Sequence, residues 1–298
     1  MDASAALARG FREVRSAAVE LPVADGGEGT AAVVQRVLGG EWPETVVSDP
    51  LGRPVRARWL VLPDGRALVE VAEAVGLPLL APSERDPLRA SSRGLGELLL
   101  AALEERPTAL LVALGGSATV DGGAGMREVL HELPVPTSAL CDVRTTLADA
   151  ARLYGPQKGA SADDVAVLEE RLAARSELRP FASLPGAGAA GGLGAALAAL
   201  GAELVPGAPT VLDLIDFDRA LAESDLVVTG EGEVDSTTAE GKAPGEVARR
   251  AGAAGTRCVV FGGRVDAEVE GAETVALSGM PERAEADLVE LGSQLAVG

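Results

Sequence analysis

Residues 109–119 read A-L-L-V-A-L-G-G-S-A-T, an apolar run followed by paired glycines and two hydroxyl side chains. A continuous apolar run of this length is typical of a strand that is covered on both faces in a parallel sheet. Because glycine permits tight turns, the strand is expected to pass directly into a loop and then a helix. This succession predicts an α/β fold.

A second succession of the same kind lies near the end of the chain. Leu226–Thr229 reads as a buried strand that runs into a glycine loop, Pro244–Ala251 as a helix and Arg257–Phe261 as the next strand. Strand, loop, helix and strand in this order form a βαβ unit. The sequence therefore predicts parallel strands in both the first and the second half of the chain.

The remaining periodic segments complete this prediction. Alternation over Val55–Val61, flanked by Thr45–Ser48 and Ala67–Val71, predicts an antiparallel meander. Alternation over Ala17–Val23 predicts a further short strand that ends at Pro22. Helical spacing is found over Ala5–Val14 (with Ser4 as N-cap), Thr30–Leu38, Gly94–Glu105, Asp163–Arg175 and Gly191–Leu200. Together they indicate two interleaved α/β domains.

Composition excludes several classes of protein. The 298 residues are 47% hydrophobic and carry a net charge of -19, which favours a globular chain and disfavours binding to nucleic acid or anionic membranes. Two cysteines, the lack of a signal peptide and the lack of a long apolar segment predict a reduced, cytoplasmic protein. An enzyme of anionic substrates would then need backbone N–H groups and a few placed cations.

Several loops combine glycines with carboxylates or hydroxyls. Each alone is more often a turn, and none is a Walker A or a Rossmann fingerprint. Several together favour a Mg²⁺–phosphate site, because carboxylates hold the metal while backbone amides hold phosphate oxygens. The candidate residues are Asp25, Gly26, Gly27 and Glu28; Gly115, Gly116, Ser117, Thr119 and Asp121; Gly188, Gly191 and Gly192; and Gly230, Glu231, Asp235 and Lys242.

The order of these loops resembles the two-domain bacterial glycerate kinase family. The matching strings are L-P-x-A-D-G-G-E-G-T, D-P-L-G-x-P-V, G-G-S-A-T-x-D-G-G-A-G-M, C-D-V, G-P-Q-K-G-A, P-G-A-G-A-A-G-G-L-G and V-T-G-E-G-x-V-D-S, from Leu21 to about Arg250. The resemblance implies a Rossmann-like lobe, residues 1–45 and 218–298, with a second α/β lobe, 46–217, inserted in it. It also implies transfer of the ATP γ-phosphoryl group to a hydroxyl of D-glycerate, or a similar hydroxy acid, with Mg²⁺.

The resemblance assigns roles to individual residues, each of which has a structural alternative. Asp142 and Lys158 are expected to be catalytic, Asp142 as general base or substrate contact and Lys158 as a phosphate cation. Asp142 could instead cap the next helix, and Lys158 could be a solvated loop lysine. Asp25 and Asp235 are the expected metal ligands, although Asp25 could equally cap the helix that begins at Thr30.

The chain also departs from the family pattern. It begins after the family's first strand and its A-P-D-S-F-K segment, Val120 stands in place of Asn, and Arg127–Leu140 replaces a longer segment. Near Asp235, Glu233 replaces a basic residue and Thr237 replaces Gln. A start codon placed too far downstream would explain the N-terminus alone. A catalytically impaired paralogue, acting as a small-anion or nucleotide-binding regulatory protein, would also explain the interior changes.

Overall fold

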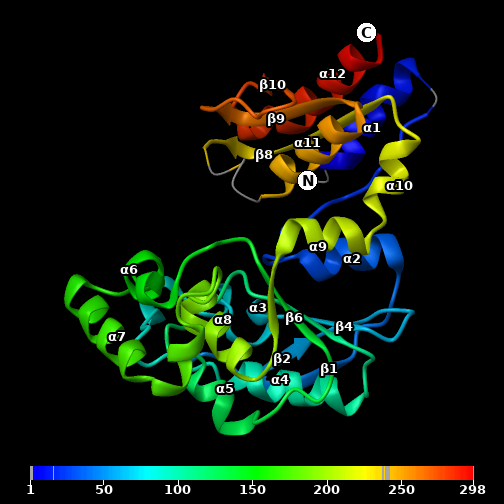
Figure 1. Cartoon of the computed structure of the whole chain (residues 1–298). Coiled ribbons are helices and arrows are strands. Elements are labelled where there is room, and N and C mark those ends of the chain that lie inside the picture. Colours follow the sequence, from blue (N-terminus) through cyan, green and yellow to red (C-terminus); the bar gives the residue numbers. More distant parts are fainter. Residues whose placement is uncertain (1–2, 16, 237, 239–241, 298) are drawn as a thin grey trace. The chain divides into compact units, whose positions relative to one another are not determined.

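A computed structural model divides the chain into two compact α/β units (Figure 1) and describes residues 3–15, 17–236, 238 and 242–297. Unit 1 comprises Met1–Val23 and Leu212–Gly298, and unit 2 comprises Ala24–Val211. In sequence, unit 2 is thus inserted in unit 1, and the expected α/β class with one lobe inserted in another is confirmed. The lobe boundaries expected from the sequence, at 45/46 and 217/218, stay predictions.

Unit 2 is built on a five-stranded sheet in the order β3-β4-β5-β6-β7. Only β3 is antiparallel to its neighbour, while β4 to β7 are parallel. The strands are β3 (Leu60–Val61), β4 (Ala67–Glu70), β5 (Leu110–Ala113), β6 (Thr137–Cys141) and β7 (Glu203–Pro206). Every residue of β5 is buried, as the apolar run predicts for a strand covered on both faces.

Helices cover this sheet and enclose one core of leucine, valine and alanine side chains. They are α2 (Thr30–Leu38), α3 (Val71–Val75), α4 (Arg93–Glu104), α5 (Ala124–Val129), α6 (Ala150–Tyr154), α7 (Ala162–Ala174) and α8 (Ala189–Ala199). Short 3₁₀ turns lie between them, including η4 (Pro156–Lys158). The five helices expected from sequence spacing are all present, with ends shifted by two residues or fewer.

The prediction that residues 45–71 form one antiparallel meander is wrong. β1 (Glu44–Ser48) and β2 (Pro54–Arg58) form a separate antiparallel hairpin, while β3 and β4 belong to the main sheet. The chain leaves β2 at Trp59, whose side chain is 4% exposed and belongs to the core. Leu60, directly after Trp59, is also buried, and these two consecutive buried residues end the alternation that suggested one strand over 55–61.

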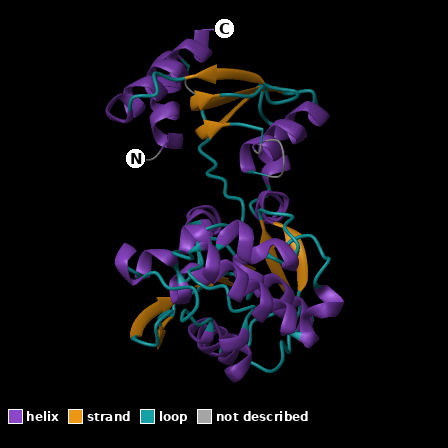
Figure 2. Cartoon of the chain, turned by 90° about the vertical axis from the view of Figure 1, so that its left-hand side faces the viewer, coloured by secondary structure: helices purple, strands orange, loops and turns teal. Residues whose placement is uncertain are grey.

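Unit 1 contains a parallel sheet in the order β10-β9-β8, with helices on both sides of it (Figure 2). Its strands are β8 (Leu226–Val234), β9 (Arg257–Val265) and β10 (Glu273–Ala276). Its helices are α1 (Ala3–Val14), α10 (Phe217–Ala222), α11 (Ala243–Ala254) and α12 (Ala284–Val297), and α9 (Gly207–Leu214) crosses the unit boundary. The β8-α11-β9 succession confirms the predicted βαβ unit.

Three local predictions in unit 1 are wrong. Residues 17–23 form no strand: Pro22 has no N–H to donate, and Val19 is 79% exposed. Strand β8 does not end at Thr229 but continues to Val234, and it pairs with β9 on both sides of Gly232. Helix α1 begins at Ala3, so Ser4 lies inside the helix and does not cap it.

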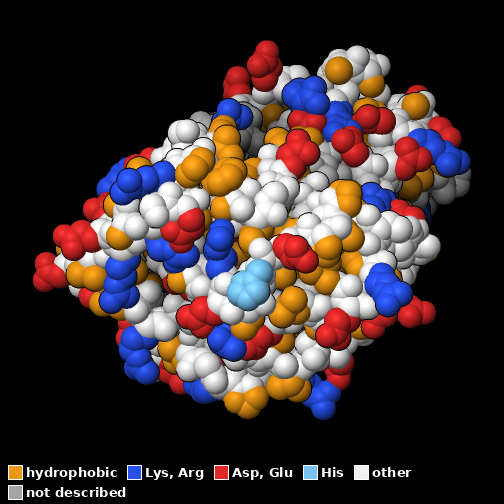
Figure 3. Space-filling model, turned by 60° about the horizontal axis from the view of Figure 1, so that its bottom comes forward, with side chains coloured by type: hydrophobic (Ala, Val, Ile, Leu, Met, Phe, Trp, Pro, Cys, Tyr) orange, Lys and Arg blue, Asp and Glu red, His pale blue; other side chains and the backbone are white. Residues whose placement is uncertain are grey.

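The surface carries both signs of charge. Figure 3 shows acidic and basic side chains interspersed on the face in view, and the single histidine, His131, is exposed. None of the helices in the described residues is long and apolar enough to cross a membrane.

Candidate functional site

The candidate loops of unit 2 meet at the carboxyl edge of its parallel strands. Residues 115–119 follow β5, Asp142 follows β6 and Gly207 follows β7. A Cβ atom at Gly115 would lie 2.5 Å from the Cα of Gly27, and one at Gly207 would lie 1.8 Å from the carbonyl oxygen of Asp25. The backbone of residues 25–28 therefore lies directly against the strand ends, where α/β sheets bind ligands.

Lys158 is the best-defined side chain at this edge. It ends turn η4, is 3% exposed, and donates hydrogen bonds to the Oγ of Ser117 at 2.8 Å and the carbonyl oxygen of Thr119 at 2.9 Å. Burial lowers the pKa of Lys158 to about 7, opposed only in part by the charge of Asp121. The structure thus excludes the alternative of a solvated loop lysine and joins Lys158 to the glycine loop.

The neighbourhood of Asp142 connects to the same turn. Asp142 is exposed at the end of β6. Its negative charge adds to burial in raising the pKa of Cys141 to about 12 and the pKa of Tyr154. The Tyr154 hydroxyl lies 2.6 Å from the Oγ1 of Thr145, and the Tyr154 ring centroid lies 6.0 Å from the Lys158 Nζ. Tyr154 is therefore a neighbour of both residues that are expected to be catalytic: the charge of Asp142 acts on its hydroxyl, and its ring lies near the Nζ of Lys158.

The helix α2 is capped by a residue that the sequence analysis missed. Glu70, at the end of β4, accepts hydrogen bonds from the backbone N–H groups of Gly29 at 3.2 Å and Ala31 at 2.6 Å. Burial raises the pKa of Glu70, and these N–H donors oppose the rise. Asp25 instead accepts from Gly27 at 3.1 Å, within its own loop. A carboxylate at the end of a short apolar strand was the available signal for Glu70.

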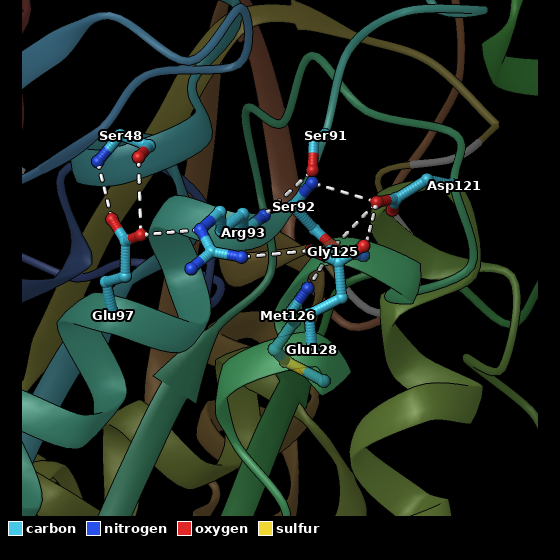
Figure 4. A network of polar contacts seen from close by, with 9 residues as sticks. All are labelled: Ser48, Ser91, Ser92, Arg93, Glu97, Asp121, Gly125, Met126 and Glu128. Carbon is cyan, nitrogen blue, oxygen red and sulfur yellow. Dashed lines mark hydrogen bonds and ion pairs between the residues drawn. The ribbon is translucent and has the colours of Figure 1, made fainter.

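Asp121 is held in a network that joins two helix starts (Figure 4). Its carboxylate accepts from the backbone N–H and the hydroxyl of Ser92, each at 2.8 Å, and from Gly123 at 3.0 Å and Gly125 at 3.1 Å. The Ser92 hydroxyl in turn accepts from Met126 at 2.9 Å. Asp121 thus satisfies N–H groups at the start of α5 and fixes α4 beside it.

The loop 185–194 packs against the residues that follow β5 and β6. Ala190, Gly191 and Gly192 have φ values of 52°, 71° and 93°, so α8 has a left-handed segment in its first turns. A Cβ atom at Gly191 would lie 2.0 Å from the carbonyl oxygen of Thr119, and one at Gly188 would lie 2.2 Å from that of Thr146. Because these glycines lack a Cβ, the loop can pack closely against the backbone of the residues that follow β5 and β6.

The candidate residues of unit 1 form their own cluster. Lys242 lies 3.3 Å from the Oε2 of Glu231 and 3.8 Å from the Oδ1 of Asp235, and Thr238 donates to Glu231 at 2.6 Å. Gly230 lies inside β8, where a Cβ atom would be 2.3 Å from the carbonyl oxygen of Phe261. Glu233 pairs with Arg264 across the strands, and Thr237 lies outside the described residues.

The predicted residues thus fall into two groups. In unit 2, the loop 25–28, Gly115, Gly116, Ser117, Thr119, Asp142 and Lys158 gather at one sheet edge, supported by Asp121, Gly188, Gly191 and Gly192. In unit 1, Glu231, Asp235 and Lys242 gather after β8. Over the residues that the structure describes, no group of three or more His, Cys, Asp or Glu side chains is arranged to hold a metal ion.

Comparison with known proteins gives a consistent result. The sequence model of the Glycerate kinase family matches residues 1–133 and 131–286. A glycerate kinase of Bacillus subtilis is 39% identical over 296 residues, covering 84% of this chain and 78% of that protein. A glycerate 2-kinase of Escherichia coli is 39% identical over 284 residues, covering 80% and 74%. A crystal structure assigned as glycerate kinase 2 of Salmonella typhimurium LT2 matches with a TM-score of 0.84 and 31% identity, covering 99% of this chain and 93% of that one.

Proposed function

The chain belongs to the glycerate kinase family, and on this premise we propose that it transfers the γ-phosphoryl group of ATP to a hydroxyl of D-glycerate with Mg²⁺. The observation that carries the proposal is the buried ammonium of Lys158, which donates to the loop after β5. A buried cation at the carboxyl edge of a parallel sheet suits a ligand that carries negative charge.

The roles of the residues follow from the needs of phosphoryl transfer, which depends mostly on positioning and on neutralising charge. Asp142 is exposed at the strand end and takes the proton of the acceptor hydroxyl. Lys158, Ser117 and Thr119 hold an anionic group beside it. Backbone N–H groups of the glycine loops, those of Gly26, Gly115 and Gly116 among them, would donate to phosphate oxygens.

The proposal assigns the nucleotide and the metal to side chains of suitable chemistry. Asp25 in unit 2 and Asp235 in unit 1 each carry a carboxylate, the hard oxygen ligand that Mg²⁺ prefers, and either one would hold the ion together with phosphate oxygens. When bound, Mg²⁺ neutralises charge on the transferred group. Lys242, already beside Glu231 and Asp235, supplies a cation for the phosphates of the nucleotide.

A coupled assay of ADP release, with D-glycerate, ATP and Mg²⁺, tests the proposal. Turnover that requires all three components is expected, and ³¹P NMR of the product identifies the hydroxyl that is phosphorylated. Ligand-induced stabilisation without turnover would instead support the regulatory alternative.

A further inference from the structure

The chain has two lysines, one in the candidate group of unit 2 and one in the candidate group of unit 1. Lys158 and Lys242 are the only lysines among the 26 basic residues of the sequence. Lysine differs from arginine in being a compact charge that tolerates burial and can lose its proton. Lys242 has carboxylates within 4 Å, whereas no carboxylate oxygen of the described residues lies that close to the Nζ of Lys158. Lys158 is thus a buried cation without an anion.

Polar groups around Lys158 have unused hydrogen-bonding capacity. An ammonium group has three donors, and Lys158 uses two of them, to Ser117 and Thr119. The Oγ1 of Thr119, a fully buried residue, has no hydrogen-bond partner among the described residues. Buried polar groups are normally satisfied, so the unpaired hydroxyl of Thr119, the residue whose carbonyl oxygen accepts from Lys158, indicates a missing partner.

A second cation lies against the same turn. Gly159 follows Lys158 with φ at 100°, and a Cβ atom there would lie 2.6 Å from the carbonyl oxygen of Arg85. The Nε of Arg85 is buried and has no hydrogen-bond partner within the described part of the chain.

We propose that Lys158, Ser117 and Thr119 form the subsite that binds the carboxylate of the acceptor substrate, so that the protein selects hydroxy acids over neutral polyols. This inference rests on the proposed function and names the acceptor group that the site recognises. One carboxylate oxygen accepts the third hydrogen of the Lys158 ammonium, and the other accepts the hydroxyl hydrogen of Thr119. The hydroxyl of Thr119 then has a partner, and Lys158 uses all three of its donors.

The charges favour a carboxylate over a phosphate group at this position. A carboxylate carries a single charge, which one ammonium neutralises, whereas a phosphate group carries up to two and presents three acceptor oxygens. Asp121, the negative charge that acts on Lys158, would repel a polyphosphate more strongly than a monocarboxylate. Tyr154, whose ring faces Lys158, adds no charge in its neutral form.

Steady-state kinetics of two variants test the subsite. Thr119→Val keeps the shape of the side chain and removes a hydroxyl that has no protein partner, so the fold is expected to persist. We expect roughly a tenfold rise in KM for D-glycerate with KM for ATP unchanged, because a hydrogen bond to a charged group is lost. Thr137→Val is the matched control, since Thr137 is also buried but begins β6 at the opposite edge of the sheet.

Binding measurements test the role of charge directly. In isothermal titration, D-glycerate is expected to bind the wild type at least about 100-fold more tightly than glycerol, which lacks the carboxylate. Lys158→Met is expected to abolish this preference. Affinity for D-glycerate within twofold of the wild type in both variants would overturn the inference, as would displacement of D-glycerate by inorganic phosphate at lower concentration than by acetate.

The two proposals fail separately. If the wild type turns over D-glycerate but Thr119→Val and Lys158→Met raise KM for ATP alone, the subsite is wrong and the proposed function stands. If the wild type shows no turnover but binds D-glycerate in a manner that depends on Lys158, the function is wrong and the subsite stands.

Discussion

The Nζ of Lys158 lies 2.8 Å from the Oγ of Ser117, and the two residues are 41 positions apart in the sequence. The bond ties turn η4 to the loop after β5 inside the protein, where Lys158 is 3% exposed. Burying an ammonium without a carboxylate destabilises the folded state, since two neutral acceptors replace only part of its hydration. The position therefore suits a residue kept for ligand binding rather than for stability.

Replacing Lys158 with methionine is expected to raise the free energy of unfolding at pH 7 by roughly 1–3 kcal/mol. The pKa of Lys158 is lowered from 10.5 to about 7 in the folded protein. Between these two values the unfolded chain binds more protons, so the contribution of Lys158 to stability rises with pH. Urea unfolding of wild type and variant at pH 7 and pH 9 measures this. The difference in free energy of unfolding between the variant and the wild type should be smaller at pH 9 than at pH 7. A difference that does not depend on pH would contradict the burial of a charged Lys158.

Replacing Asp121 with alanine is expected to destabilise the protein by about 2–4 kcal/mol. The substitution leaves N–H groups of Gly123, Gly125 and Ser92 without their acceptor. Thermal unfolding measures the loss. Asp163→Ala, on the exposed face of α7, is the control and should change stability by less than about 1 kcal/mol. An equal effect of the two substitutions would show that the network of Figure 4 contributes little.

The sequence predicts this fold well where one signal dominates. The apolar run at 109–114 and the periodic helices are set by local burial, so Thr30–Leu38 is predicted to the residue. It fails where tertiary contacts decide. Glycines at 230 and 232 suggest a loop, but pairing with β9 carries the strand through them. Alternation over 17–23 suggests a strand, but no neighbouring strand pairs with it in the described residues.

The candidate site is predictable in its members but not in their roles. The resemblance places Lys158 and Asp121 together in the site, whereas only the structure distinguishes an ammonium without a carboxylate from a carboxylate with four donors. Glu70 was missed because its partners, Gly29 and Ala31, lie about 40 residues earlier in the chain. Hydrogen bonds over such separations depend on the packing of strands, which local sequence does not specify.

Replacing Gly191 with alanine is expected to destabilise the protein by more than about 3 kcal/mol. The new Cβ would lie 2.0 Å from the carbonyl oxygen of Thr119, at a φ of 71°. Gly201→Ala separates the steric clash from the left-handed backbone strain. Its φ is 98°, but no heavy atom lies within 4 Å of the new Cβ. That variant should lose only the roughly 1–2 kcal/mol of left-handed strain. Thermal unfolding compares them, and equal losses would mean that the close approach to Thr119 is relieved by small shifts.

Replacing Asp142 with asparagine is expected to lower kcat for D-glycerate phosphorylation by roughly 10²–10⁴-fold, because an amide cannot take the hydroxyl proton. Because Asp142 is exposed at the end of β6, the substitution is expected to leave the fold intact, and unchanged thermal unfolding verifies this. KM values for D-glycerate and ATP should stay within a few-fold of the wild type if the lost interaction is made mainly in the transition state. Asp163→Asn on α7 is the control for surface charge, with expected wild-type activity. A kcat for Asp142→Asn within tenfold of the wild type would remove Asp142 from the role of general base.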